Sequence, residues 1–165
     1  MKGICPMCEK VVELDHIKGK EVYEIKEKKI EIDVDYFKCL ECNDEFEDPN
    51  SENDPIEDAY IKYREQTCLM QPYEIRKLRK HYGLTQSELS NLLGWGGATL
   101  SRYENGALQD GAHDNLLQLI KDPQSMLTLI NKNGDFLPAD KKKSLKRELS
   151  TAANDSCSNI CAFRE

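Results

Sequence analysis

Two pairs of cysteines constrain the fold of this 165-residue chain more than any other feature. Two residues separate Cys5 from Cys8 and Cys39 from Cys42, and thirty residues lie between the pairs. Two residues between thiols let a tight turn aim both sulfurs at one point, and a second such turn completes the tetrahedron that Zn²⁺ accepts in structural sites. Four protein ligands leave no open position for water. The pattern therefore predicts a structural zinc ion and argues against metal-assisted hydrolysis.

Two other interpretations of these cysteines stay open at this point. The thiols can be unliganded, or they can bind iron, because a four-cysteine site of nearly this spacing resembles rubredoxin. Rubredoxins usually have glycine after the second cysteine of each pair, whereas this chain has Glu9 and Asn43 there. Asparagine tolerates the left-handed backbone that glycine would supply, but glutamate does so poorly, which favours zinc. A red product would indicate iron, and a colourless one with stoichiometric zinc would exclude it.

The segment between the cysteine pairs predicts a small antiparallel sheet. Ile30, Ile32, Val34 and Tyr36 alternate with acidic residues, a period of two that is typical of a half-buried strand. Residues 22–25 form a weaker partner strand. Because the core of such a segment is thin, metal binding would contribute to its folding free energy. We expect a four-cysteine zinc-binding domain over residues 1–47.

The rest of the chain predicts helices. Residues 48–70 are expected to form a polar linker and a connecting helix, and residues 71–132 a series of short helices separated by glycines. Residues 133–165 are rich in Lys, Ser and Asn and are expected to form a flexible tail, with at most a short helix near Leu145 and Leu149. The predicted fold class is α+β, with a small zinc-bound antiparallel β domain before an all-α helix-turn-helix domain.

Residues 83–106, GLTQSELSNLLGWGGATLSRYENG, predict the helix-turn-helix itself. Thr85 is a favourable N-cap, and Glu88 three residues later completes a capping box. Gly94 ends this first helix, and a second short helix runs over residues 98–105. A helix, a short turn that contains glycine and a second helix are typical of proteins that place a recognition helix in the major groove of DNA.

The outward residues of the second helix suit contacts with base edges. Arg102 can bond a guanine bidentately, while Ala98 and the methyl group of Thr99 can contact a thymine methyl. Gln86 and Asn105 are placed to bond phosphates. The preceding helix adds four basic residues that attract the backbone of DNA: Arg76, Lys77, Arg79 and Lys80. The predicted DNA interface consists of Gln86, Gly97, Ala98, Thr99, Ser101, Arg102 and Asn105. The alternative is a plain helical bundle in which Arg102 and Glu104 are solvated charges.

The acidic charge of the chain lies apart from this interface. The formal net charge is −7, but residues 1–70 carry 10 Lys and Arg against 19 Asp and Glu, and residues 71–132 carry 7 against 6. Net charge is therefore a poor argument against DNA binding here, because the halves differ.

Location and chemistry follow from what the sequence does not contain. No apolar run approaches the roughly 20 residues that span a bilayer, and the N-terminus has no apolar signal region, which predicts a cytoplasmic protein. A reducing compartment favours metal or free thiols over disulfides. Cys68 is expected to be a packing residue, while Cys157 and Cys161 receive no role. Without a catalytic constellation, we expect no enzyme activity.

These motifs resemble known families. LTQSELSNLLG followed by TLSRYENG is similar to the Cro-type repressor helix-turn-helix. The combination with CPMC, CLEC and the Met70-Gln71-Pro72 join resembles the MqsA/YgiT-type antitoxin family over residues 4–132. The resemblance implies that Cys5, Cys8, Cys39 and Cys42 hold zinc. It also implies base contacts from an Asn at the start of the recognition helix and an Arg four residues later; this chain has Arg102, but Ala98 replaces the Asn.

The resemblance implies the antitoxin of a type II toxin-antitoxin system. The zinc domain would neutralise a toxin encoded by an adjacent gene, and the helical domain would dimerise on an inverted-repeat operator and repress its own operon. The acidic N-terminal half suits a basic, RNA-attacking toxin. The alternative is a regulator of a phage or mobile element that uses the same domains without a toxin partner.

Overall fold

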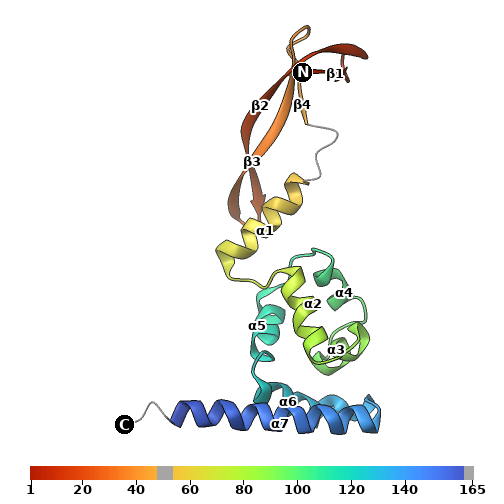
Figure 1. The fold of residues 1–165 in the computed structure, drawn as a ribbon, viewed down its shortest axis with the longest axis vertical. Coiled ribbons are helices and arrows are strands. Elements are labelled where there is room, and N and C mark those ends of the chain that lie inside the picture. Colours follow the sequence, from red (N-terminus) through yellow and green to blue (C-terminus); the bar gives the residue numbers. More distant parts are fainter. Residues whose placement is uncertain (48–53, 162–165) are drawn as a thin grey trace. The chain divides into compact units, whose positions relative to one another are not determined.

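The computed structural model describes residues 1–47 and 54–161, with side chains as far as residue 153. The chain divides into two compact units, Met1–Thr67 and Cys68–Glu165 (Figure 1). The part of the predicted linker over residues 48–53 lies outside the described residues. The connecting helix is not a linker element, because it belongs to the first unit and packs on its sheet.

The first unit is an antiparallel sheet with one helix, which confirms the predicted β domain. Its strands are joined in the order β1-β2-β3-β4. A two-residue turn at Lys26 and Glu27, both with positive φ of 46° and 69°, joins β2 to β3, as a tight hairpin requires. The described elements of this unit are β1 (Lys2–Cys5), β2 (Lys10–Ile25), β3 (Lys28–Cys39), β4 (Glu45–Glu47) and α1 (Pro55–Thr67).

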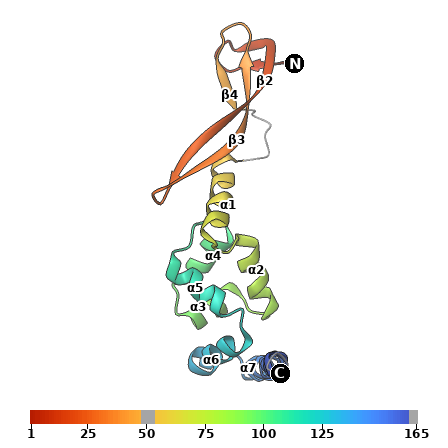
Figure 2. The same ribbon diagram turned by 90° about the vertical axis from the view of Figure 1, so that its left-hand side faces the viewer.

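The long β2–β3 hairpin, whose course is drawn in Figure 2, buries opposite faces at its two ends. Towards the turn, the even-numbered residues Ile30, Ile32 and Val34 of β3 are buried, and α1 packs against this strand. Towards the cysteines, the odd-numbered Phe37 and Cys39 are buried instead. Successive side chains of a strand point to opposite faces. One hairpin therefore supports two separate small cores, one under α1 and one around the cysteines.

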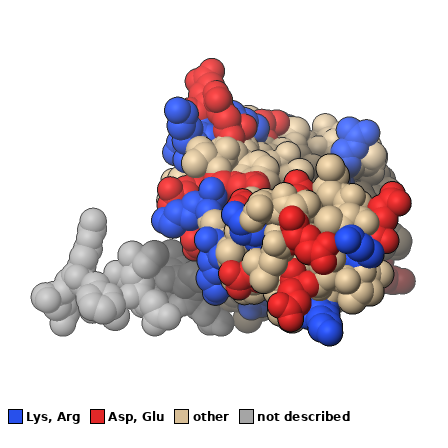
Figure 3. Space-filling view, turned by 90° about the horizontal axis from the view of Figure 1, so that it is seen from above, with Lys and Arg blue, Asp and Glu red and all other residues tan. Residues whose placement is uncertain are grey.

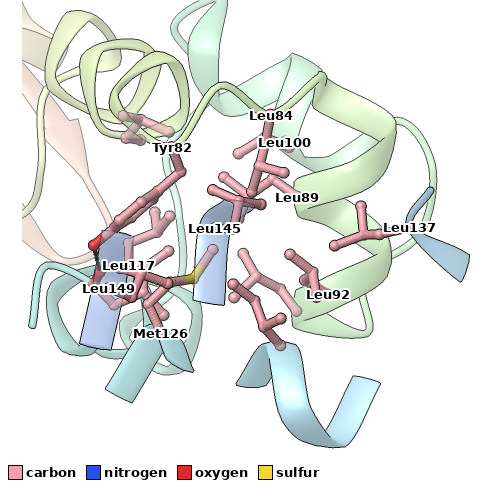
Figure 4. Packing of buried hydrophobic residues seen from close by; sticks show 14 of the residues in the cluster. Tyr82, Leu84, Leu89, Leu92, Leu100, Leu117, Met126, Leu137, Leu145 and Leu149 are labelled. Atoms are coloured by element: carbon pink, nitrogen blue, oxygen red, sulfur yellow. Dashed lines mark hydrogen bonds between the residues drawn. The ribbon is translucent and has the colours of Figure 1, made fainter. Parts of the chain in front are cut away.

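The second unit is helical. Sixteen buried residues from most of its helices form one core, of which Figure 4 labels ten. The described elements are α2 (Pro72–His81), α3 (Gln86–Leu93), α4 (Thr99–Glu104), α5 (Gly111–Leu119), α6 (Pro123–Asn133), the short 3₁₀ helix η1 (Gly134–Phe136) and α7 (Ala139–Cys161).

The structure corrects the prediction of a flexible tail over residues 133–165. Helix α7 has 23 residues and packs along α6. Leu137, Leu145 and Leu149 are each at most 6% exposed and complete the core (Figure 4). The polar composition hid this role because two buried leucines four residues apart, with Leu137 just before the helix, are enough to attach a helix that is otherwise solvated. The side chains of Cys157 and Cys161 lie outside the described residues.

Candidate metal centre and nucleic-acid interface

The four predicted cysteine ligands come together at one end of the first unit. Cys5 ends β1 and Cys8 lies in the turn to β2, while Cys39 ends β3 and Cys42 lies in the turn that follows. Their four sulfur atoms lie within 4.8 Å of one another, with Cys5 to Cys42 at 3.7 Å and Cys8 to Cys39 at 3.9 Å. A zinc ion with Zn–S bonds of about 2.3 Å has ligand sulfurs about 3.8 Å apart in a regular tetrahedron. The cluster therefore has the size of a four-thiolate metal site.

Both cysteine turns have the same backbone geometry. The N–H groups of Glu9 and Asn43 each donate to the carbonyl of the first cysteine of their pair at 2.9 Å. Both residues have left-handed backbones, with φ of 54° and 59°. Glu9 thus adopts the conformation that the sequence argument considered unfavourable for glutamate, and that argument against iron does not hold.

The thiols have different proton affinities. Backbone N–H donors, first that of Cys42, lower the pKa of Cys39 to about 7. Hydrogen bonding to the sulfur of Cys42 raises the pKa of Cys8 to about 12. Four adjacent thiolates repel one another, so the cluster as a whole ionises only when a cation compensates their charge. Cysteine donors in a closed tetrahedron are the set that structural Zn²⁺ uses.

The start of the predicted helix pair forms as its sequence indicates. Thr85 Oγ1 accepts a hydrogen bond from the Glu88 N–H at 3.2 Å, and Glu88 Oε2 accepts one from the Thr85 N–H at 2.7 Å. This confirms the capping box of α3. Gly94 ends α3 in the left-handed conformation, with φ of 71°. A side chain at this φ would strain the turn that leads into α4.

Helix α4 packs its inner face as predicted. Leu100 is fully buried and Tyr103 is 8% exposed, and both belong to the core of the unit. Arg102 is exposed, and so are Ala98 at the N-cap and Asn105 at the C-cap. Of the other predicted interface residues, Gly97 is exposed, while Gln86, Thr99 and Ser101 are half-buried.

Glu104 is not the solvated charge that the plain-bundle alternative supposed. It is 2% exposed and accepts hydrogen bonds from Arg79 at 2.6 and 2.9 Å. Gln86 Nε2 donates to the same carboxylate at 2.8 Å, and Arg76 Nη2 donates to the Glu104 carbonyl at 2.8 Å. Three helices, α2, α3 and α4, are therefore joined through one buried carboxylate.

This network changes the roles expected of the basic residues. Burial alone would raise the pKa of Glu104, but the hydrogen bonds from Arg79 and Gln86 and the charge of Arg79 lower it. Glu104 is therefore a carboxylate that holds Arg79 and Gln86 in place. Of the four basic residues expected to attract DNA from α2, Lys77 and Lys80 are exposed and make no ion pair with any described residue.

An aromatic cluster at the α3–α4 turn escaped sequence reasoning. Tyr103 Oη and His113 Nδ1 lie 2.6 Å apart, and the ring centroids of Trp95 and His113 are 4.5 Å apart. Asp110, the N-cap of α5, lies 3.1 Å from the same His113 nitrogen. Within the turn, Trp95 alone hinted at such a cluster, because His113 comes from a different helix, α5.

These two sites define a class of protein: an α+β chain with a cluster of four cysteines that can hold a metal ion in one unit and a capped helix pair in the other. The family can be named as well. Residues 1–137 match MqsA, the antitoxin component of bacterial toxin-antitoxin systems, and the chain belongs to this family. No curated relative matches the chain. In the part of the chain that the structure describes, no helix is both long and apolar enough to cross a bilayer.

Proposed function

We propose that this antitoxin is a zinc-containing, DNA-binding repressor of its own operon, and that it neutralises the toxin encoded beside it. The observation that carries the DNA-binding part is the arrangement of α4. Its apolar residues are locked into the core and its buried Glu104 is tied to α2 and α3, while Arg102 remains exposed. A rigid helix with an outward guanidinium is what reading a guanine edge requires.

The proposed interface keeps the residues expected from the sequence, with one change of role. Arg102, Ala98 and Thr99 would contact base edges, and Ser101, Asn105 and Gly97 would lie along the groove and the adjacent phosphates. Gln86 donates its side-chain amide to Glu104. A phosphate contact from Gln86 would therefore use its backbone N–H at the start of α3, where the helix dipole favours an anion.

Zinc is the metal we propose for Cys5, Cys8, Cys39 and Cys42. The sulfur separations and the donor set support it, and the position of the cluster explains its role. Among the described residues, the buried core at this end consists of Cys5 and Cys39 themselves together with Val12, Leu14 and Phe37. A metal that joins the two turns would replace the missing core, which is a structural and not a catalytic task.

The first unit is the proposed toxin-binding part. Residues 1–67 carry 10 Lys and Arg against 19 Asp and Glu, a balance of −9. Figure 3 shows acidic side chains interspersed with basic ones over the face in view. Such an excess steers association with a basic partner, and a toxin that binds RNA would be one. The family match supports a toxin partner over a phage regulator without one.

A homodimer in the cytoplasm completes the proposal. Inverted-repeat operators are read by two copies related by a twofold axis. Leu119 at the end of α5 is 59% exposed and Phe136 in η1 is 44% exposed. Burying these apolar side chains between two copies would be favourable.

Expression of the neighbouring gene tests the antitoxin assignment. Its product alone should arrest growth, and co-expression of this chain should restore growth and give a complex that co-purifies. A neighbouring product without toxicity, or a toxic one that this chain neither binds nor neutralises, would overturn it.

A further inference from the structure

The helix pair that we propose for DNA binding is poor in positive charge. Residues 83–106 contain one basic residue, Arg102, and two acidic ones, Glu88 and Glu104. On the preceding helix, Arg76 and Arg79 are hydrogen-bonded to Glu104. Neutralisation of phosphates supplies a large share of the affinity of most DNA-binding proteins. Lys77 and Lys80 of α2 remain exposed, and any further phosphate contact from the second unit would add to these few cations.

Helix α7 contains a second run of positive charge in this unit, in addition to the four basic residues within 76–80 of α2. Between residues 139 and 149 it has five basic residues, Lys141, Lys142, Lys143, Lys146 and Arg147, against two acidic ones. Three lysines follow directly on the first two residues of the helix. The dipole at a helix N-terminus disfavours cations. The lysines in the first turn of α7 are therefore at an unfavourable position for the helix dipole.

Two attachments hold the start of α7 beside α3. Lys141 Nζ lies 2.7 Å from Glu88 Oε2, the carboxylate of the α3 capping box. Leu145 and Leu149 anchor the following two turns in the core. The N-terminal turn of α3 is the part of the helix pair from which we expect phosphate contacts. Lys141 thus neutralises an acidic residue at the proposed interface and ties the first turn of α7 to α3.

The other basic residues of α7 differ in how far their charge is already neutralised. Lys142 pairs with Asp135 at 2.7 Å, and Lys146 lies near this same carboxylate. Lys143 and Arg147 are exposed, and neither forms an ion pair with any residue that the structure describes. They are four residues apart, so they lie on one face of the helix, where like charges repel. A polyanion across this face would remove the repulsion.

We propose that Lys143, Lys146 and Arg147 form a second DNA contact, which binds phosphates flanking the bases that α4 reads. This inference rests on the proposed DNA-binding function. Helix α7 lies beyond residue 137, where the match to the antitoxin family ends. The contact is therefore an addition carried by this chain outside the matched region, and it compensates for a helix pair with a single cation.

The test measures how salt weakens DNA binding. The full-length K143Q/K146Q/R147Q variant is titrated against a fluorescent duplex of the chain's own upstream promoter over a range of NaCl concentrations. Each phosphate contact contributes about 0.9 to the slope of log K against log salt. The slope should fall by about 2 to 3 in the variant. Far-UV circular dichroism checks that α7 still folds.

A charge-matched variant serves as the control. K18Q/K28Q/K29Q removes three exposed lysines from the β2–β3 hairpin of the first unit, and its slope should equal that of the wild type. An unchanged slope in the α7 variant, or an equal fall in both variants, would overturn the inference. If the wild type itself fails to prefer its promoter to a scrambled duplex, the proposed DNA-binding function fails instead.

Discussion

The two units of this antitoxin solve the problem of stability in different ways. The second unit buries sixteen residues in one core, while the cysteine end of the first unit buries five. In the first unit, the missing apolar area coincides with four sulfurs at metal-binding distance. In the second, a buried carboxylate joins three helices. A small sheet can thus depend on a metal where a helical unit of about 100 residues can depend on packing.

Removal of the metal should show the largest difference in stability between the two units. Cys39→Ser, or a strong chelator, should unfold the cysteine end of the first unit, because structural zinc binding contributes about 10–16 kcal/mol in small domains. The second unit should be unaffected. Trp95, the single tryptophan, lies in the second unit and reports its unfolding by fluorescence. Zinc content and amide NMR spectra report on the first.

Cys68→Ser is the matched control. Cys68 lies outside the cluster and is exposed, so the expectation of a packing residue was wrong. It should retain one zinc per chain and a native spectrum. A Cys39→Ser protein that keeps the spectrum of residues 1–47 would mean that the sheet folds without metal.

Among substitutions in the second unit, loss of the buried Arg79–Glu104 ion pair should reduce the free energy of unfolding the most. Arg79→Ala leaves Glu104 buried beside Gln86 without its principal cation, and breaking such a pair typically costs about 3–5 kcal/mol. Urea unfolding followed by Trp95 fluorescence measures it. Lys77→Ala, an exposed change on the same helix, should shift stability by less than about 0.5 kcal/mol. Equal effects of the two variants would show that Glu104 does not need Arg79.

Shortening a buried side chain of α7 tests whether this helix contributes to the stability of the second unit. Leu149 is 4% exposed, and Leu149→Ala should reduce the free energy of unfolding by about 3 kcal/mol. Ser150→Ala, on the exposed side of the same turn, should change it little. If both variants unfold like the wild type, α7 is not part of the core.

The capping box gives the smallest of these effects. Thr85→Ala removes the hydrogen bond to the Glu88 N–H and should destabilise the second unit by about 1 kcal/mol. Ser87→Ala, in the same exposed turn, should have a smaller effect. An identical urea midpoint for Thr85→Ala and the wild type would show that Glu88, held by Lys141, secures α3 without the threonine.

Features that depend on neighbours in the sequence could be predicted, and features that depend on distant partners could not. The cysteine turns, the Thr85–Glu88 box and the end of α3 at Gly94 follow from residues within a few positions of one another. The burial of Glu104 depends on Arg79, 25 residues away, and that of Leu149 depends on helices earlier in the chain. No local pattern shows such contacts, and polar composition hid the role of α7.

The hairpin shows the same limit. Alternation in β3 predicted a strand, and Ile30, Ile32 and Val34 are buried as expected. Tyr36, which was expected on the same face, is only half-buried. The change of buried face before Phe37 was not predicted, because a period of two describes one covered face. It cannot show that a helix covers one end of the hairpin while the four cysteines lie at the other.

Binding of the wild type and Arg102→Ala to the chain's own promoter tests the central claim most directly. In fluorescence anisotropy at moderate salt, the wild type should prefer the promoter to a scrambled duplex by about 10³-fold or more. Arg102→Ala should lose about 10- to 100-fold of this preference, whereas Lys80→Ala should weaken both duplexes equally. A wild type without preference, or an Arg102→Ala protein that keeps all of it, would contradict the account.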